Sequence, residues 1–333
     1  MNRFIRWCTV FAAAALFGAP GPPAASAQSV EIDEWPVPWE NTRPRDPWVE
    51  SPRRVWFVGQ RGHYVGLLDP ETAEFERWDL DPGTGPHNLI VDDEGIVWYA
   101  GNRAAHIGRL DPETGEIEKI AMPDPAARDP HTLVFDPEGD IWFTVQGGNR
   151  VGHLDVETRE VRLVEVPTAS ARPYGIVVDP GGRPWFTEFG SYKIGTVDPA
   201  TMELREYELP RAEARPRRLA RTSDGMIWYV DYATGRLGRL DPDDGEVREW
   251  PMPGGPDSRP YGMAVDDEDR LWFVETGLSP NRFVGFDPAT GEFTPPVPVP
   301  SGGGTVRHMD YHEPTHSVWF GTDANTIGRA TLP

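Results

Sequence analysis

The chain is dominated by short runs in which apolar and polar residues alternate, the pattern of β-strands whose two faces differ. The clearest example spans residues 171–210, where segments 175–179, 183–188, 193–198 and 203–208 are rich in β-branched and aromatic residues. Asp-Pro-Gly-Gly, Gly-Ser-Tyr and Asp-Pro-Ala-Thr separate these segments as turns. Connections this short cannot hold crossover helices, so the pattern predicts four strands that pair antiparallel, each with the one before it.

The same unit recurs along the chain, anchored on a Trp that is followed by Phe or Tyr. Successive anchors lie 42 to 47 residues apart, and each is followed by a hydrophobic-Gly pair, from Val65-Gly66 to Ile327-Gly328. The period predicts an all-β fold, a β-propeller of seven four-stranded blades. We expect the Trp and Gly residues to pack blade against blade. The anchors are Trp56, Trp98, Trp142, Trp185, Trp228, Trp272 and Trp319.

The two ends of the repeat predict how the ring closes. Residues 28–38, QSVEIDEWPVP, resemble the ends of later blades, whereas the last copy stops at residue 333 after its third strand. The N-terminal segment is therefore expected to supply the outer strand of the last blade, which removes an exposed sheet edge. Residues 43–51 are then an irregular innermost strand of the first blade. Residues 28–333 are expected to form one domain.

Residues 1–27 have the pattern of a secretory signal peptide. Arg3 and Arg6 precede an apolar run over residues 7–19, and the segment ends in the small residues Ala25-Ser26-Ala27. The run is too short to span a bilayer, and no other stretch is long and apolar enough. Cleavage would remove Cys8, the single cysteine, which excludes disulfides, cysteine metal ligands and cysteine nucleophiles. We expect a periplasmic or secreted protein, and a monomer.

The net charge of −21 argues against nucleic acid as a partner, because such a surface repels phosphate. The acidity is interpreted as a means of staying soluble outside the cell. Acidic turns between the third and fourth strands, such as Asp111-Pro112-Glu113-Thr114-Gly115, are assigned to hairpin geometry and not to calcium, since a calcium loop needs more oxygen ligands.

The least uniform position lies just before each innermost strand, after a recurrent X-Pro step. A packing position would carry one apolar type, so the His, Tyr and Arg residues found there predict a polar, solvent-facing mouth of the central channel. A second such position ends each second strand, and four consecutive blades carry an acid there. Chance scatter of polar residues is the alternative. The first set is Arg45, His87, His131, Tyr174, Arg217, Tyr261 and His308, and the second is Gly59, Gly101, Val145, Glu188, Asp231, Glu275 and Asp323.

The blades, written as X-Arg-Pro-Tyr-Gly-Ile, Trp-Phe-Thr-Glu, Lys-Ile-Gly and Glu-Tyr-X-Leu-Pro, resemble those of the streptogramin B lyase (virginiamycin B lyase) family over almost all of residues 28–333. The resemblance implies a seven-bladed propeller and an enzyme that opens a cyclic depsipeptide antibiotic by elimination, assisted by Mg²⁺, which would confer antibiotic resistance. In that chemistry a His removes a proton beside a carbonyl, and carboxylates hold the cation.

The family carries Arg-Pro-His in the sixth blade, Glu-Pro-His in the last, and a Glu at the end of the last blade's second strand. This chain has Arg259-Pro260-Tyr261, Val306-Arg307-His308 and Asp323 in their place. The resemblance implies His308 as the base and Asp323, with Glu275, as ligands of Mg²⁺. The chain therefore lacks the first His and the motif carboxylate on which metal binding and lyase activity depend in the family.

Three alternatives stay open. A lyase site relocated to blades two and three would use His87 and His131 as base and Asp129 as metal ligand. A non-catalytic propeller would bind a small molecule, cyclic peptide, glycan or partner protein through Tyr174, Arg217, Tyr261, Glu188 and Asp231. A sugar lactonase is the weakest alternative, because its ligand pattern has no match here. No Gly-X-Ser-X-Gly motif supplies a serine nucleophile.

Overall fold

The computed structural model describes residues 29–333. The signal peptide predicted over residues 1–27 lies outside the described residues. None of the helices in residues 29–333 has the length and apolar character needed to cross a membrane.

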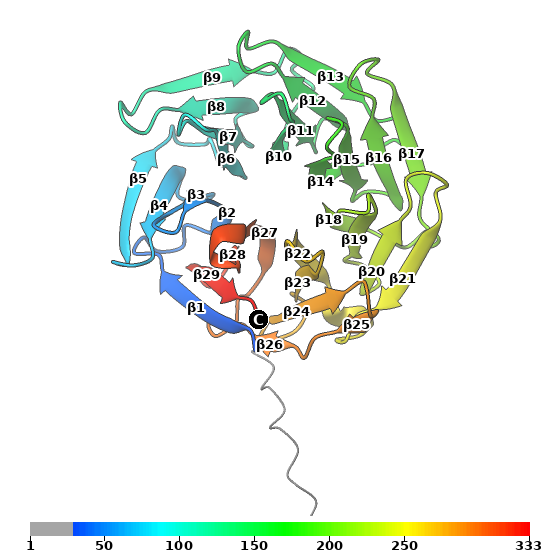
Figure 1. Cartoon of the computed structure of the whole chain (residues 1–333). Coiled ribbons are helices and arrows are strands. Elements are labelled where there is room, and N and C mark those ends of the chain that lie inside the picture. The colour runs from blue at the N-terminus through cyan, green and yellow to red at the C-terminus, as the bar shows by residue number, and fades with distance from the viewer. Residues whose placement is uncertain (1–28) are drawn as a thin grey trace, which may run out of the picture.

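Seven antiparallel sheets surround a central channel, which confirms the predicted seven-bladed ring (Figure 1). Each sheet is a meander whose first strand lies innermost. Blades one to three contain β2 (Pro44–Ser51), β3 (Arg54–Gly59), β4 (Tyr64–Asp69) and β5 (Glu74–Asp79); β6 (Leu89–Val91), β7 (Val97–Gly101), β8 (His106–Leu110) and β9 (Ile117–Ala121); and β10 (Pro130–Phe135), β11 (Ile141–Val145), β12 (Arg150–Leu154) and β13 (Val161–Glu165).

The remaining blades follow the same plan, with two short 3₁₀ turns at η1 (Pro256–Ser258) and η2 (Glu313–Thr315). Blades four and five contain β14 (Pro173–Val178), β15 (Pro184–Glu188), β16 (Lys193–Val197) and β17 (Leu204–Glu208), then β18 (Pro216–Arg221), β19 (Ile227–Asp231), β20 (Arg236–Leu240) and β21 (Val247–Pro251). Blades six and seven contain β22 (Pro260–Val265), β23 (Leu271–Glu275), β24 (Arg282–Asp287), β25 (Glu292–Phe293) and β26 (Val297–Pro298), then β27 (Val306–His312), β28 (Ser317–Thr322), β29 (Thr326–Thr331) and β1 (Glu31–Pro36).

The repeated Trp residues pack between blades, as the sequence predicts, whereas each repeated Gly makes room for an aromatic ring of the neighbouring strand in its own blade. Trp98 is buried, and its indole N–H donates to Asp92 in the preceding turn at 2.8 Å. Gly66 lies under the ring of Phe57, where a Cβ atom would come within 2.4 Å of the ring. Larger residues would separate strands that must lie in contact, because interiors are close-packed.

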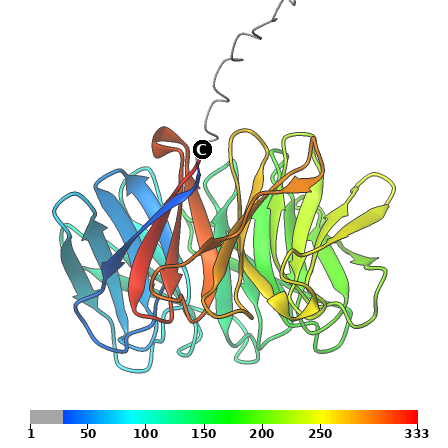
Figure 2. The ribbon, with the colours of Figure 1, turned by 90° about the horizontal axis from the view of Figure 1, so that it is seen from below.

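The ring closes through the N-terminal strand, which confirms that expectation (Figure 2). Strand β1 pairs antiparallel with β29 from Glu31↔Thr331 to Pro36↔Thr326. Trp35 stacks on Trp319, with ring centroids 5.4 Å apart. The Asn325 side-chain amide donates to the Val37 carbonyl at 3.0 Å, so the two ends of the chain are joined by backbone, aromatic and side-chain contacts.

Blade six has a broken outer edge. Its outer strand is divided into β25 and β26, which pair separately with β24. Pro295 and Pro296 lie between them, and proline has no N–H to donate to the ladder.

Candidate functional site

A β-bulge interrupts the innermost strands where the sequence places the polar ring. In β14 the register moves from Pro173↔Glu188 to Ile176↔Phe186, and β10 and β22 show the same shift. A bulge sets two residues against one and bends the strand, so it re-aims the side chains of the bulged pair. We call the end of the channel at which the innermost strands begin the upper mouth.

Below the upper mouth, polar side chains cross the channel and close it. Asp46 is fully buried and accepts from Arg45 Nε at 2.9 Å and from Arg218 Nη2 at 3.3 Å. Arg218 also donates to Thr132 Oγ1 at 3.0 Å and to the backbone carbonyl of Arg307 at 2.9 Å. One side chain of blade five thus bonds to blades one, three and seven. We call Arg45, Asp46, His87, His131, Tyr174, Arg218 and Tyr261 the channel layer.

The histidines of the channel layer do not face solvent, so the expected solvent-facing mouth is wrong for them. His87 and His131 are only 4% and 2% exposed, and their ring centroids lie 3.5 Å apart. Burial, together with neighbouring arginines, lowers the pKa of both imidazoles well below 6.5. Both are therefore neutral at pH 7 and almost completely buried.

Arg217 lies above this layer, among four aromatic rings. Its guanidinium carbon is 3.9 Å from the ring centroid of Phe189, 4.2 Å from Tyr232, 4.1 Å from Tyr261 and 5.1 Å from Tyr174. Within residues 29–333 it forms no ion pair, and its Nε is buried without a hydrogen-bond partner. The cation is stabilised by ring faces, and its polar edge has no acceptor.

The hydroxyls of Tyr174 and Tyr261 contact each other beneath Arg217. Burial raises the pKa of the Tyr174 hydroxyl, but the charges of Arg217, Arg45 and Arg218 outweigh it and leave that pKa below its usual value of 10.0. The pKa of Tyr261 is raised, first by burial and then by Tyr174. The arginines around this pair therefore favour negative charge.

The carboxylates predicted for the rim do not gather into one site, because each binds separate partners, some of them in a neighbouring blade. Burial raises the pKa of Glu188 to about 7 and that of Asp129 to about 6. The partners are Ser191 for Glu188, the backbone amides of Arg215 and Ala233 for Asp231, Arg282 and the amide of Gly254 for Glu275, and Asn102 for Asp129.

The register of blade seven corrects two of the expected equivalences. Val306 pairs with Thr322 as Pro260 pairs with Glu275, so Arg307 occupies the ring position expected for His308. Thr322 ends the second strand, and Asp323 follows it. Asp310 and its strand partner Trp319 are nine positions apart, whereas Ala264 and its partner Trp272 are eight apart, so the connection in blade seven, which contains η2, has one extra residue. Counting back from the Trp therefore gives a position one residue too late.

Asp323 is bound to two arginines. Arg307 donates to both of its oxygens, at 2.5 and 2.6 Å, and Arg43 Nε lies 3.5 Å away. Burial raises the pKa of this carboxyl, but the two arginines lower it below its ordinary value. The charge that a divalent cation would need is already neutralised.

The residues expected to hold Mg²⁺ do not fit that role. A cation at Glu275 or Asp323 would have to displace Arg282 or Arg307 from a charge-assisted hydrogen bond, and the two acids belong to different blades. Asp129, in blade three, is engaged by Asn102. Magnesium prefers several oxygen ligands in an octahedron, which no group among these acids supplies.

Asp136, Asp140 and His153 form the one group of three possible ligands within reach of one cation among the residues described. His153 Nε2 lies 3.4 Å from Asp136 and 3.6 Å from Asp140, while Arg162 contacts Nδ1 at 3.1 Å. A guanidinium only donates, so Nδ1 accepts and Nε2 carries the proton that points at the acids. A metal-bound His has the opposite arrangement, with Nδ1–H facing an acceptor. We therefore interpret Asp136, Asp140 and His153 as a hydrogen-bonded cluster and not as a metal site.

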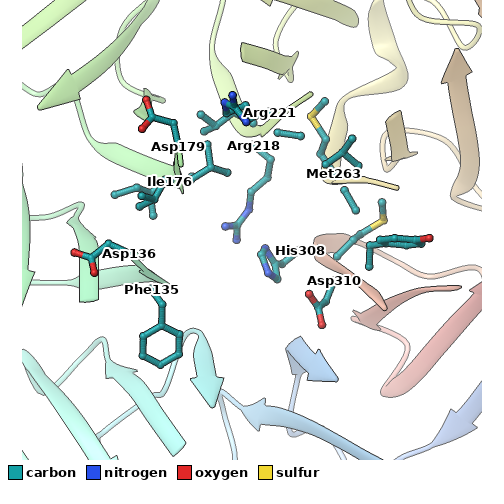
Figure 3. Close-up of a pocket in the computed structure, with 18 of the residues that line it drawn as sticks. Phe135, Asp136, Ile176, Asp179, Arg218, Arg221, Met263, His308 and Asp310 are labelled. Carbon is teal, nitrogen blue, oxygen red and sulfur yellow. The ribbon is translucent and has the colours of Figure 1, made fainter. Parts of the chain in front are cut away.

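A cavity of about 650 Å³ opens at the other end of the channel, between the innermost strands of blades three to seven (Figure 3). We call it the lower cavity. Arg218, His308 and Asp310 lie at its inner end, and Ile176, Met263 and other apolar residues form its wall. Burial lowers the pKa of His308 to about 3 and raises that of Asp310 to about 7. His308 thus belongs to this cavity and not to the rim with Asp323.

Sequence reasoning missed Arg218 and Asp310, although a signal was present. Once the bulges are aligned, Asp310 takes the place held by apolar residues in other blades, such as Val134, Val177 and Ala264. Arg218 takes the place of Gly175 and Gly262. The signal is a charged residue at a position where the other blades carry an apolar residue or Gly. It can be recognised only when the strands are aligned with their bulges.

The fold and the site can be set beside known proteins. The sequence profile of the virginiamycin B lyase family matches residues 24–183 and 157–332. The chain belongs to the virginiamycin B lyase family. No curated protein sequence matched the chain.

Among solved structures, the propeller is similar to a catalytically inactive variant of virginiamycin B lyase from Staphylococcus aureus with quinupristin, at 23% identity over 92% of this chain and 100% of the other, with a TM-score of 0.83. A streptogramin B lyase structure is 24% identical over 91% and 98%, with a TM-score of 0.82. Kuenenia stuttgartiensis hydrazine synthase shares 16% identity over 88% and 96%, with a TM-score of 0.71. At these identities the likeness concerns the fold alone.

Proposed function

We propose that this virginiamycin B lyase family member is a ligand-binding propeller, and that its upper mouth binds a small organic carboxylate with an apolar or aromatic body. The observation that carries the proposal is Arg217, a cation among four rings with no ion pair in the described chain. A carboxylate ligand would accept from its free polar edge, and the rings would contact the body of the ligand.

The surroundings of Arg217 support an anionic ligand. Arg172 and Arg259 are exposed and lie over Phe189 and Tyr232, at 5.5 and 5.9 Å from the ring centroids. A further cavity of about 330 Å³ adjoins Arg172. Arginine precedes the first Pro of an innermost strand in four blades, at Arg43, Arg172, Arg215 and Arg259. This local positive charge stands out on a chain of net charge −21.

The lyase alternative has less support in the geometry. In register, the chain carries Tyr261 and Arg307 where the family motifs have His, and Thr322 where the last blade has Glu. Arg307 binds Asp323, and the acids do not converge on a cation site. Quinupristin, named with the relative's structure, remains a compound to test because binding and ring opening are separable.

Calorimetric titration with 3-phenylpropionate and its neutral amide tests the proposal. The acid should bind at least tenfold more tightly than the amide, because only the acid pairs with Arg217. Arg217→Met should abolish that preference while filling the same space between the rings. Arg205→Met, which removes an exposed arginine of β17, should leave it unchanged.

Two results would overturn the proposal. One is equal affinity for acid and amide. The other is Mg²⁺-dependent loss of cyclic quinupristin, measured by chromatography. If His308→Ala or Tyr261→Phe abolished that loss, the protein would be a lyase.

We further propose that the chain is exported and meets its ligand outside the cytoplasm. The support is the charge, apolar run and small-residue ending of residues 1–27. Fusing residues 1–40 to a reporter that is active only after export should give signal, whereas replacing the apolar run with polar residues should abolish it.

A further inference from the structure

We propose that the lower cavity is a second binding site, distinct from the upper mouth, and that it takes a small organic amine whose ammonium group pairs with Asp310. The inference concerns the opposite end of the channel from Arg217. It therefore does not depend on the function proposed above.

The shape and lining of the lower cavity suit a small molecule. Its volume of about 650 Å³ falls within the range of about 300–1,000 Å³ that is usual for small-molecule sites. Ile176, Val178, Leu219, Met263 and Met309 give it an apolar wall. Arg218, His308 and Asp310 lie at its inner end, as Figure 3 shows, while Asp136, Asp179 and Arg221 lie farther out.

Asp310 is the group in this cavity that lacks a matching partner. Its Oδ2 accepts the backbone N–H of Val49 at 2.9 Å, and it forms no ion pair among residues 29–333. The nearby cation, Arg218, is already bound by Asp46, Thr132 and a backbone carbonyl. An isolated carboxyl in apolar surroundings is unfavourable when charged, so a cationic ligand would supply the missing counter-charge.

The charges around the cavity complement a cation. The lining contains Asp136 and Asp179 against the single further arginine Arg221. Asp267 lies beside this end of the channel, where it accepts from the Tyr311 hydroxyl. The titratable groups on the elements packed around Asp310 are Arg307, His308, Tyr311 and His312 on β27; Arg45, Asp46 and Glu50 on β2; Tyr261 on β22; and Arg217, Arg218 and Arg221 on β18.

None of these groups forms an ion pair with Asp310. Arg45 is paired with Asp46, and Glu50 accepts from Arg54 and from the Trp56 indole. Burial lowers the pKa of His308, which also lines the cavity, so its imidazole is neutral and adds no positive charge near Asp310. Asp310 therefore offers an ammonium group an ionic partner.

The test uses phenethylamine and 2-phenylethanol, which share a body and differ in charge. Titrations of the protein without residues 1–27, followed by NMR of the methionine methyl groups, should place both probes against Met263 and Met309. At pH 8 the amine should bind at least tenfold more tightly than the alcohol. At pH 5.5 most Asp310 is protonated, so affinity for the amine should fall roughly tenfold or more while that for the alcohol stays constant.

Variants separate this site from a merely apolar pocket. Asp310→Asn keeps an oxygen that accepts from the Val49 N–H. This variant should lose the preference for the amine but still bind the alcohol. Ala264→Leu narrows the cavity and should weaken both probes. Glu138→Gln removes an exposed charge of the adjacent hairpin, and Arg217→Met alters the other mouth; neither should change the affinity for the amine.

Three outcomes would overturn the inference. They are equal affinity of the wild type for the two probes at pH 8, an unchanged preference in Asp310→Asn, and binding of neither probe at millimolar concentration. The first and third need no variant, so the inference can be refuted even if Asp310→Asn fails to fold. Loss of carboxylate binding at the upper mouth would leave it untouched.

Discussion

Single residues that depart from the repeat carry most of the chemistry in this protein. Asp310 replaces an apolar residue beside the lower cavity, Arg307 replaces the aromatic or imidazole residue of the ring, and Arg217 lies among aromatic rings. Each departure places a charged side chain at a position where most other blades carry an uncharged one, or among aromatic rings. The effects of burial and partners on that charge can be measured through stability.

Asp310→Asn should change how stability depends on pH. The pKa of Asp310 is raised from 3.8 to about 7 in the folded state, so the unfolded chain releases this proton first as pH rises. The wild type therefore loses stability between about pH 4 and pH 7 through this group. Relative to that of the wild type, the free energy of unfolding of the Asn variant should rise by on the order of 2 kcal/mol from pH 4 to pH 8, as measured by urea unfolding. A constant difference across that range would contradict the assignment.

Arg307→Ala should destabilise the protein at pH 7 by about 1 kcal/mol, because it leaves a partly buried Asp323 with only the more distant Arg43. The pKa of Asp323 is lowered in the folded state, so this contribution exists above the unfolded pKa and disappears as pH falls below it. The difference from wild type should thus shrink at pH 3. Arg53→Ala, which breaks an exposed pair, is the control and should have no measurable effect.

At the scale of elements, the strands differ in how much they contribute to closing the ring. Strand β1 comes from the opposite end of the chain to its partner β29, so it converts an open row of blades into a closed one. The outer strand of blade six, by contrast, does not close the ring. Prolines divide it and weaken that sheet edge, and the ring stays closed.

Deleting residues 28–38 should lower the melting temperature by on the order of 10 °C, because blade seven loses a six-residue ladder and the stack of Trp35 on Trp319. The matched control begins at residue 28 and retains the strand. Scanning calorimetry of the two proteins decides the matter, and equal melting temperatures would show that closure does not depend on β1.

At the scale of the whole molecule, the channel layer lies between two ends that carry different charged groups. Exposed arginines and the acids that end the second strands border the upper mouth, whereas Asp136, Asp179 and Asp310 border the lower cavity together with Arg218 and Arg221. Arg218 and Asp46 join blades one and five between the two ends. Among residues 29–333, the acids near the channel do not converge on a point where several blades could bind one cation.

Magnesium should therefore have no effect on the isolated protein. The melting temperature in 5 mM EDTA and in 5 mM MgCl₂ should agree within about 1 °C, because a ligand that binds the folded state would raise it. Zinc and manganese serve as comparisons for the cluster at His153. A rise with magnesium alone, lost in Glu275→Gln or in Asp323→Asn, would restore the metal site that the resemblance implies.

The seven blades, the strand order and the closure by residues 28–38 could all be predicted from the sequence, since they follow from local periodicity, turn residues and a repeat that lacks one strand. The selection of Tyr174, Arg217 and Tyr261 as residues near the upper channel likewise came from their variation within the repeat. Which polar residues face solvent could not be predicted, because that depends on contacts between blades far apart in the chain.

His308 and Asp323 illustrate what only the tertiary structure decided. The sequence places them by counting from Trp319. An extra residue in the connection between β27 and β28 moves the ring position from His308 to Arg307, and His308 lines the lower cavity instead. The pairing of the second strand ends at Thr322, one residue before Asp323. Arg218 closes the channel through partners on three other blades, which no local pattern encodes. Periodicity determines each blade because its strands pair with neighbours in sequence, whereas the centre of the ring is assembled from all seven blades, so its contacts exist only once the ring has closed.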